Sequence, residues 1–350
     1  MELYVHDNEP QRLYEWTGPL LEVDDLWLEF RTRDGVVQAL NGVSYHVAAG
    51  ETLAILGESG SGKSVSAQAV MGLLETPPAY VTAGSIRYRG EELLRASDEE
   101  WRQVRGKEIA MIFQDALSAL NPVFSVGWQI AETLRVRQGM SKADALNRAV
   151  ELMDLVRIPA ARQRLRDYPH QFSGGMRQRV MIAMALALDP PVLIADEPTT
   201  ALDVTVQAQI MGLLNELRIE RNMALILITH DLGVVADIAD RIAVMYAGRI
   251  VEHSDVHSLY AAPGHPYTRG LLESLPRLDL KGHKLTSIPG LPPSLTQIPS
   301  GCPFHPRCPY AQQVCVDQVP EDHLLPGTHA DGRTSACHFA EEVVRIPAAS

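Results

Sequence analysis

A glycine-rich segment at residues 57–64 has the residue types and spacing of a phosphate-binding loop. Glycines let backbone amides turn toward phosphate oxygens, and the start of a following helix adds a favourable dipole. We expect Lys63 to pair with the terminal phosphates of a nucleotide and the Ser64 hydroxyl to bind Mg²⁺. A chance glycine-rich turn is the alternative, which the flanking strand and helix patterns disfavour. The segment matches GxxxxGKS through Gly57, Glu58, Ser59, Gly60, Ser61, Gly62, Lys63 and Ser64.

Two acidic residues follow a short apolar run at residues 192–195. Phosphoryl transfer with magnesium needs a carboxylate at the end of a buried strand beside the phosphate loop. Asp196 suits the metal shell, whereas Glu197 points to the other side of the strand end and suits a general base for the attacking water. The alternative is a pair of solvated acids that cap a strand.

Two further polar residues end apolar runs. His230 follows the run at residues 225–229, and Gln114 follows the run at residues 109–113. At the same sheet edge, His230 is expected to contact the γ-phosphate, and Gln114 to bind magnesium or hold the water. A lone histidine is more often structural, so both roles depend on the phosphate loop.

The surrounding pattern predicts elements that bring these residues together. Residues 21–30 and 36–47 alternate apolar and polar side chains around the turn pair Asp34 and Gly35, which indicates a β-hairpin. Residues 52–56 predict a strand ahead of the phosphate loop, and residues 64–74 a helix after it. We expect a strand, loop and helix in that order.

The middle of the chain is predicted to be helical, followed by a return to strand and helix alternation. Residues 125–156 have helical periodicity, with Ser141 and Asp144 resembling a capping box. Residues 192–251 alternate buried strands and helices. The predicted domains are an N-terminal extension at residues 1–20, a nucleotide-binding domain at 21–258 with a helical subdomain at about 116–178, and a loop-rich domain at 259–350.

Composition limits the classes of partner. The chain has 350 residues, with 46% hydrophobic and 21% charged, which is ordinary for a globular protein. Its formal net charge of −12 opposes binding to nucleic acid. We see neither an apolar run long enough to span a bilayer nor a secretory signal, so we expect a cytosolic protein that reaches the membrane only through a partner.

A segment ahead of the acidic strand narrows the family. Residues 172–179 read FSGGMRQR, in which Ser173, Gly174 and Gly175 could open a helix and present free amides to an anion. Here the chain resembles the nucleotide-binding subunits of ABC transporters, whose LSGGQ-type signature the segment matches. The resemblance implies a P-loop NTPase fold: a RecA-like α/β core with an antiparallel β-subdomain and a helical subdomain.

The resemblance also implies roles for individual residues in ATP hydrolysis. Gln114 matches the Q-loop of the family, Glu197 its general base and His230 its switch histidine. Phe30 lies where an adenine-stacking aromatic is usual, although a core role is equally open. The signature, from Ser173 to Gln178, contacts the ATP of an opposite subunit in this family, and the segment Ala201, Leu202 and Asp203 matches the D-loop at the dimer seam.

Longer matches indicate one branch of the family. The segments YPHQFSGGMRQR from residue 168, LITHDLGVVA from 227, HPYTRGLLESLP from 265 and GCPFHPRC from 301 resemble the ATPases of dipeptide and oligopeptide importers. This implies a second homologous ATPase subunit as a heterodimer partner, two transmembrane permease subunits and an external peptide-binding protein. A sibling importer for nickel, opines or short sugars, or a soluble ABC ATPase, remains the alternative.

All four cysteines fall in the last fifty residues. In a reducing compartment such clustering indicates a metal rather than disulfides, although the spacing is unlike paired zinc knuckles. Four thiolates suffice for a [4Fe-4S] cluster, which the resemblance to the peptide-importer branch also implies. A Zn²⁺ site and free thiols are the alternatives. The residues are Cys302, Cys308, Cys315 and Cys337.

Overall fold

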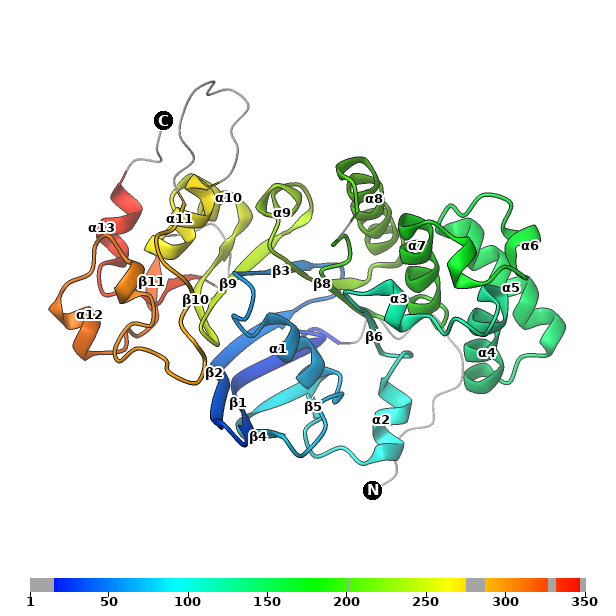
Figure 1. The fold of residues 1–350 in the computed structure, drawn as a ribbon, viewed down its shortest axis with the longest axis horizontal. Coiled ribbons are helices and arrows are strands. Elements are labelled where there is room, and N and C mark those ends of the chain that lie inside the picture. Colours follow the sequence, from blue (N-terminus) through cyan, green and yellow to red (C-terminus); the bar gives the residue numbers. More distant parts are fainter. Residues whose placement is uncertain (1–15, 201, 275–286, 327–331, 347–350) are drawn as a thin grey trace.

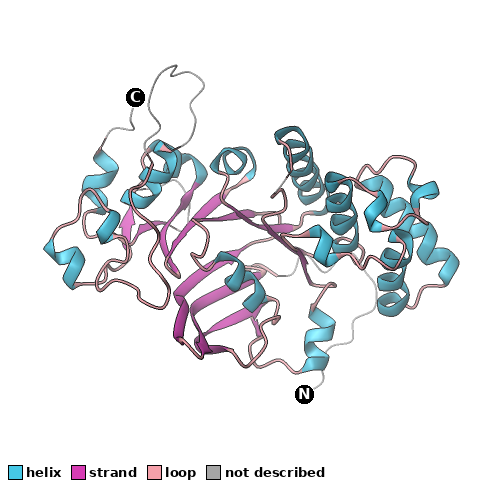
Figure 2. Cartoon of the chain, viewed as in Figure 1, coloured by secondary structure: helices cyan, strands magenta, loops and turns pink. Residues whose placement is uncertain are grey.

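The computed structural model describes residues 16–200, 202–274, 287–326 and 332–346. It contains two β-sheets, with one group of helices at one end and the C-terminal elements at the other (Figures 1 and 2). The smaller sheet has the strand order β2-β1-β4-β5. The bounds of its strands are β1 Leu21–Thr32, β2 Gly35–Val47, β4 Ala79–Tyr88 and β5 Glu91–Glu92.

The larger sheet has eight strands in the order β11-β12-β10-β9-β3-β8-β7-β6. Strands β9, β3, β8, β7 and β6 are parallel, whereas β10, β12 and β11 continue the sheet antiparallel. The bounds are β3 Thr52–Leu56, β6 Ile109–Ile112, β7 Val192–Asp196, β8 Ala224–Thr229, β9 Arg241–Tyr246, β10 Arg249–Asp255, β11 His323–Leu325 and β12 Arg333–Ser335.

Helices cover both faces of the large sheet and form a group beside it. The helix α1 lies between the two sheets, and α4 to α7 gather beyond β6 (Figure 1). The bounds are α1 Lys63–Val70, α2 Asp98–Val104, α3 Ala116–Ala119, α4 Val126–Gln138, α5 Lys142–Leu155, α6 Ala161–Arg164, α7 Gly174–Ala185, α8 Val204–Arg221, α9 Leu232–Ile238, α10 Val256–Ala261, α11 Pro266–Glu273, α12 Gln313–Asp317 and α13 Ala340–Arg345, with 3-10 turns η2 Pro169–Gln171 and η3 His305–Arg307.

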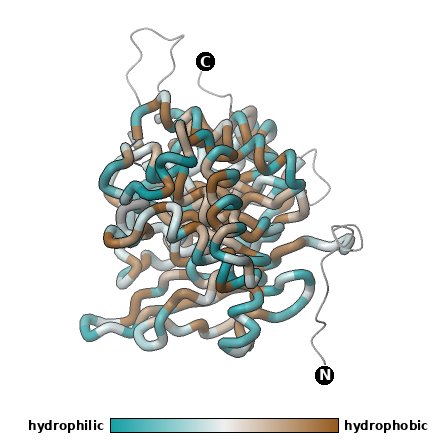
Figure 3. The backbone as a smooth tube through the Cα atoms, turned by 90° about the vertical axis from the view of Figure 1, so that its right-hand side faces the viewer, coloured by the Kyte–Doolittle hydropathy of each residue, from teal (hydrophilic) through white to brown (hydrophobic). Residues whose placement is uncertain are grey.

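The core follows from the period of the strands. Successive side chains of β3 point to opposite faces, so Leu53 and Ile55 pack against the small sheet and α1, while Ala54 and Leu56 pack against the helices on the other face. All four are at most 1% exposed. In Figure 3 hydrophobic segments of the backbone run through the middle of the molecule, and hydrophilic segments lie mainly at its edges. Each face of the large sheet therefore has its own apolar cluster.

Several predicted elements are confirmed, with small changes at their ends. The hairpin forms as β1 and β2, and the strand before the phosphate loop is β3. The predicted helix at 64–74 ends earlier, at Val70. The helical region at 125–156 divides into α4 and α5, because Gly139 ends α4 with a left-handed φ of 66° and the Ser141 hydroxyl accepts from the Asp144 amide to begin α5.

The predicted domain bounds stay predictions. Residues 1–15 of the proposed extension lie outside the described part of the chain. Strands β11 and β12 of the proposed C-terminal domain pair with β10 in the large sheet. None of the described helices is both long and apolar enough to cross a membrane.

Candidate nucleotide and cysteine sites

The parallel strands bring the predicted phosphate, acid and histidine segments to one edge of the sheet. Strands β3, β7 and β8 end in register, with Leu56 beside Thr229 and Asp196 beside Ile228. The loops that follow these ends line a pocket of about 620 Å³. Its lining includes Glu58, Ser59, Gly60, Gly62, Lys63, Ser64, Val65, Gln114, Glu197, His230 and Pro292.

The phosphate loop needs glycine where its backbone approaches other strands. Gly57 has a φ of 155°, and a Cβ added there would lie 2.3 Å from the carbonyl oxygen of Met245. Gly62, directly before α1, has a φ of 105°, and an added Cβ would lie 2.8 Å from the carbonyl oxygen of Ala39. Both contacts exclude larger residues. These two glycines therefore fix the loop against β9 and β2.

Lys63 is buried under the loop. Its ammonium donates to the carbonyl oxygens of Gly57 at 2.8 Å and Glu58 at 2.9 Å. Burial lowers the pKa of Lys63, while the carboxylates of Glu197, Asp196 and Glu58 act in the opposite direction. The side chain is thus held at the floor of the pocket, where an anionic ligand would meet it.

The two predicted magnesium ligands from the loop and β7 touch each other. The Ser64 hydroxyl donates to Asp196 Oδ1 at 3.0 Å. Burial is the main cause that raises the pKa of Asp196, and the hydrogen bond from Ser64 partly offsets it. A hydroxyl and a carboxylate oxygen are ligands that magnesium prefers. The pair therefore fits a small hard cation beside the phosphates.

Glu197 is the centre of a hydrogen-bonded group. Its Oε2 accepts from Gln114 Nε2 at 2.8 Å and from the Thr200 hydroxyl at 2.9 Å, while its Oε1 lies 3.4 Å from His230 Nδ1. Its backbone has a φ of 45°, in the left-handed region, which turns the chain sharply after β7. Two predicted side chains, those of Gln114 and His230, thus meet at the carboxylate of Glu197. Thr200 is an addition that the sequence pattern did not mark.

The adenine contact expected of Phe30 stays a prediction. Phe30 packs against the apolar cluster of the small sheet and is not among the described residues that line the pocket. Pro292, from the C-terminal region, lines it instead. No pattern around Pro292 marked it as a binding residue.

The signature segment lies at the start of α7, outside the pocket. The Ser173 hydroxyl accepts from the Met176 amide, and Gly174 and Gly175 form the first turn, while Gln178 is buried. Asp203 caps α8 through a bond from the Val206 amide. Ala201 lies outside the described residues. The signature residues and Asp203 are therefore not among the described residues that line this pocket.

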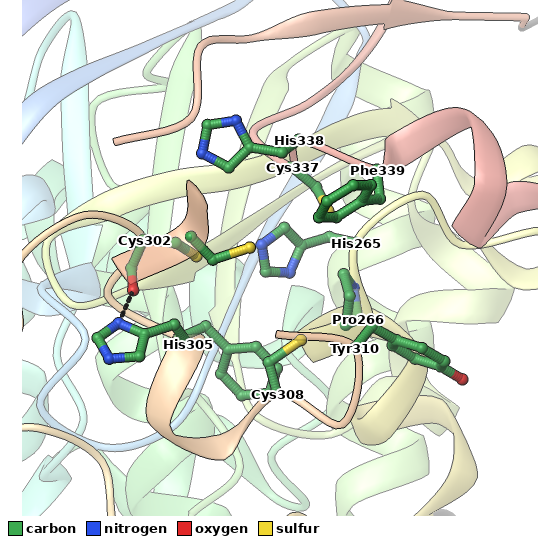
Figure 4. Close-up of a pocket in the computed structure, with 11 residues that line it drawn as sticks. His265, Pro266, Cys302, His305, Cys308, Tyr310, Cys337, His338 and Phe339 are labelled. Atoms are coloured by element: carbon green, nitrogen blue, oxygen red, sulfur yellow. Dashed lines mark hydrogen bonds between the residues drawn. The ribbon is translucent and has the colours of Figure 1, made fainter. Parts of the chain in front are cut away.

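The four cysteines line a second, smaller pocket (Figure 4). A backbone bond from the Cys302 amide to the Cys315 carbonyl joins two of their segments. Burial raises the pKa of Cys308 to about 11 and that of Cys337 to about 12. Among the described residues, no group of three or more His, Cys, Asp or Glu side chains is placed to hold a metal ion. The predicted metal site is therefore not shown, although its four thiols share one pocket.

The fold and the first pocket define a P-loop ATPase of the ATP-binding cassette class. A family model described as ABC transporter matches residues 40–200, and one described as oligopeptide/dipeptide transporter, C-terminal region, matches residues 251–315. The chain is 28% identical, with a TM-score of 0.61, to the ATP-binding cassette MJ0796 in a dimeric post-hydrolysis state bound to ADP and Pi, covering 67% of this chain and 98% of that one.

Full-length relatives narrow the class. The oligopeptide transport ATP-binding protein OppD of Salmonella typhimurium is 54% identical, and the match covers 88% of this chain and 91% of that protein. The dipeptide transport ATP-binding protein DppD of Escherichia coli is 50% identical, with 91% and 96% covered. The chain belongs to the family of oligopeptide and dipeptide transport ATP-binding proteins of ABC transporters. It is an ATP-hydrolysing subunit, as its sequence motifs predict.

Proposed function

We propose that this chain hydrolyses ATP to drive the import of dipeptides or oligopeptides, as a peripheral subunit on the cytoplasmic face of the membrane. The single observation that carries this proposal is the nucleotide pocket in a chain whose relatives are named for oligopeptide and dipeptide transport. The proposed partners are two transmembrane permease subunits and an external peptide-binding protein, in keeping with the peptide transport for which its relatives are named.

In the proposed mechanism each side chain of the pocket has one task. Lys63 would neutralise the terminal phosphates, while Ser64 and Asp196 would hold Mg²⁺, which would supply further neutralisation of phosphate charge. Glu197 accepts a proton from the attacking water, and Gln114 positions that carboxylate through its 2.8 Å hydrogen bond. His230, with a side chain 65% exposed, is free to reach the γ-phosphate. Glu197, the proposed base, and Lys63, the proposed phosphate ligand, thus lie in one pocket.

The proposed site is completed by a second, homologous ATPase subunit. The start of α7 at Ser173, Gly174 and Gly175 presents backbone amides outside this chain's own pocket. Free amides at a helix start bind anions, so this segment is suited to the ATP of a partner subunit. Asp203, which begins α8, belongs to the same proposed interface. The dimeric state reported for MJ0796 supports such an arrangement, and we assign a heterodimer here.

The cysteine pocket is proposed to hold a [4Fe-4S] cluster, with Zn²⁺ as the less favoured alternative. Thiols are the donors that iron–sulfur clusters and zinc both take. The four thiols share one pocket, but no three side chains among the described residues are placed for a single ion. The four thiols in one pocket and their donor chemistry are what support the proposed cluster, in a structural or regulatory role.

Transport is tested by uptake of labelled di- and tripeptides into cells that carry either the wild-type chain or Lys63→Ala. We expect uptake to disappear with Lys63→Ala and to persist with Arg102→Ala, an exposed control on α2. Uptake of nickel, opines or sugars that depends on Lys63, without peptide uptake, would contradict the peptide assignment. Co-purification with ribosomes or DNA in place of membrane subunits would contradict the transport role.

The cluster is tested separately by anaerobic purification with iron and sulfide assays. About four irons and four sulfides per chain are expected. The Cys315→Ser variant should lose most of both, while a zinc-only preparation would overturn the cluster.

A further inference from the structure

Two side chains from the C-terminal region bind the phosphate loop through Glu58. Arg307 donates from Nη1 to Glu58 Oε2 at 2.6 Å and from Nη2 to Glu58 Oε1 at 3.0 Å, which makes a bidentate ion pair. The Tyr267 hydroxyl accepts from the Glu58 amide at 2.8 Å. Both the side chain and the backbone of this loop residue are therefore fixed from outside the predicted nucleotide-binding domain.

The guanidinium of Arg307 is itself held in place. Its Nε donates to the carbonyl oxygen of Pro289 at 2.9 Å, and its Nη1 lies 3.3 Å from the Tyr246 hydroxyl. The ring of Phe304 lies 6.0 Å below its central carbon. The side chain is only 6% exposed, and the bond to Glu58 is the main cause that raises its pKa. An exposed ion pair loses conformational entropy when its two mobile side chains become ordered. This loss is smaller for Arg307, because its other contacts already hold the side chain in place.

The charge of Glu58 matters because of where it stands. Glu58 lines the pocket together with Lys63, and its carbonyl oxygen accepts from the Lys63 ammonium. An uncompensated carboxylate on this loop would repel a triphosphate and compete for the lysine. Arg307 neutralises that carboxylate and restricts its rotation. The ion pair thus compensates a negative charge in the lining of the pocket that the nucleotide would enter.

We propose that Arg307 is a positioning residue for ATP binding, which orients the phosphate loop and cancels the charge of Glu58. This inference rests on the proposed role of residues 57–64 as the ATP-phosphate loop. It also connects the two sites of the chain, since Arg307 belongs to η3 and directly precedes Cys308. The segment that carries two of the four cysteines therefore also holds the nucleotide loop.

The proposal is tested by titrating the full-length chain with a fluorescent ATP analogue and Mg²⁺. Arg307→Ala is expected to weaken binding roughly tenfold, about 1.4 kcal/mol. Adding Glu58→Gln to that variant should recover most of the loss, because the repelling charge is then gone. Arg307→Lys keeps a charge without the two-pronged geometry and should lie between Arg307→Ala and wild type. Arg102→Ala, an exposed arginine that also pairs with a glutamate, is the matched control.

The outcomes separate a positioning role from a merely structural one. Thermal unfolding shows whether each variant is folded, and Arg307→Lys with Glu58→Gln keeps the test available if Arg307→Ala is not. Losses that simply add in the double variant would overturn the charge role. Wild-type affinity in Arg307→Ala would overturn the whole inference. Failure of the wild-type chain to bind the analogue would contradict the proposed role of residues 57–64 in ATP binding. That result is distinct from failure of the inference about Arg307.

Discussion

Replacing Glu197 with glutamine isolates its proposed role as a base. Gln114 and Thr200 both donate to Oε2 of the carboxylate, and an amide oxygen can accept the same two bonds. The new amide nitrogen would take the place of Oε1, which faces His230 at 3.4 Å. Glu197→Gln therefore keeps the shape and the two donors, and removes only the ability to take a proton from water.

The expected loss is that of a general base, about 10²- to 10⁴-fold in the rate of hydrolysis. At about 1.36 kcal/mol for each factor of ten, this raises the barrier by roughly 2.7–5.4 kcal/mol. ATP binding should persist, because Lys63 and the Ser64–Asp196 pair are untouched. The closed ATP-bound dimer should therefore accumulate.

The assay is phosphate release at saturating ATP from the assembled transporter, with size-exclusion chromatography to detect the ATP-bound dimer. The second ATPase subunit would carry its own matching glutamate-to-glutamine change in both samples, so that only this chain's carboxylate differs. Thr200→Val is the matched control, since it removes one bond to Glu197 and leaves the base. Phosphate release within about threefold of the unsubstituted chain would refute the assignment.

Three further predictions follow from packing and metal binding. Gly57→Ala should abolish binding of the ATP analogue, because its Cβ would meet the Met245 carbonyl at 2.3 Å; normal affinity would contradict this. Asp196→Asn should remove the dependence of ATP affinity on Mg²⁺ while affinity in EDTA is kept, and an unchanged dependence would contradict its place in the metal shell. Phe304→Ala should lower the free energy of unfolding by about 3–5 kcal/mol in urea titration, since the ring is 2% exposed between Tyr246 and Tyr267; exposed Leu291→Ala is the control.

The sequence predicted the polar residues at the strand ends better than it predicted the contacts between distant segments of the chain. Apolar runs followed by Asp196, His230 or Gln114 indicate strand ends, and parallel strands must bring such ends together. The local motifs therefore placed most of the pocket. Pairing between Glu58 and Arg307 could not be predicted, because it joins distant segments through side chains that follow no period.

Single residues without a pattern were equally out of reach. Phe30 packs against the cluster of the small sheet, and its contact with the nucleotide stays a prediction, while Pro292 reaches the pocket from a loop. Loop backbones follow turn chemistry and tertiary contacts rather than periodicity, so sequence alone gives weak signals there. The cysteine pocket shows the same limit, since spacing gathered the thiols into one region but did not choose what they bind.

The continuous eight-stranded sheet has a practical consequence for anyone who wishes to shorten this protein. Because β12 pairs with β10, a chain cut after about residue 258 would expose the backbone amides and carbonyls of β10 along a bare edge. Such edges recruit strands from neighbouring molecules and lead to aggregation. A shortened form made for crystallisation or binding studies would thus need a solubilising replacement for β12, and poor yield from a simple cut would reflect a lost neighbour rather than a poorly chosen endpoint.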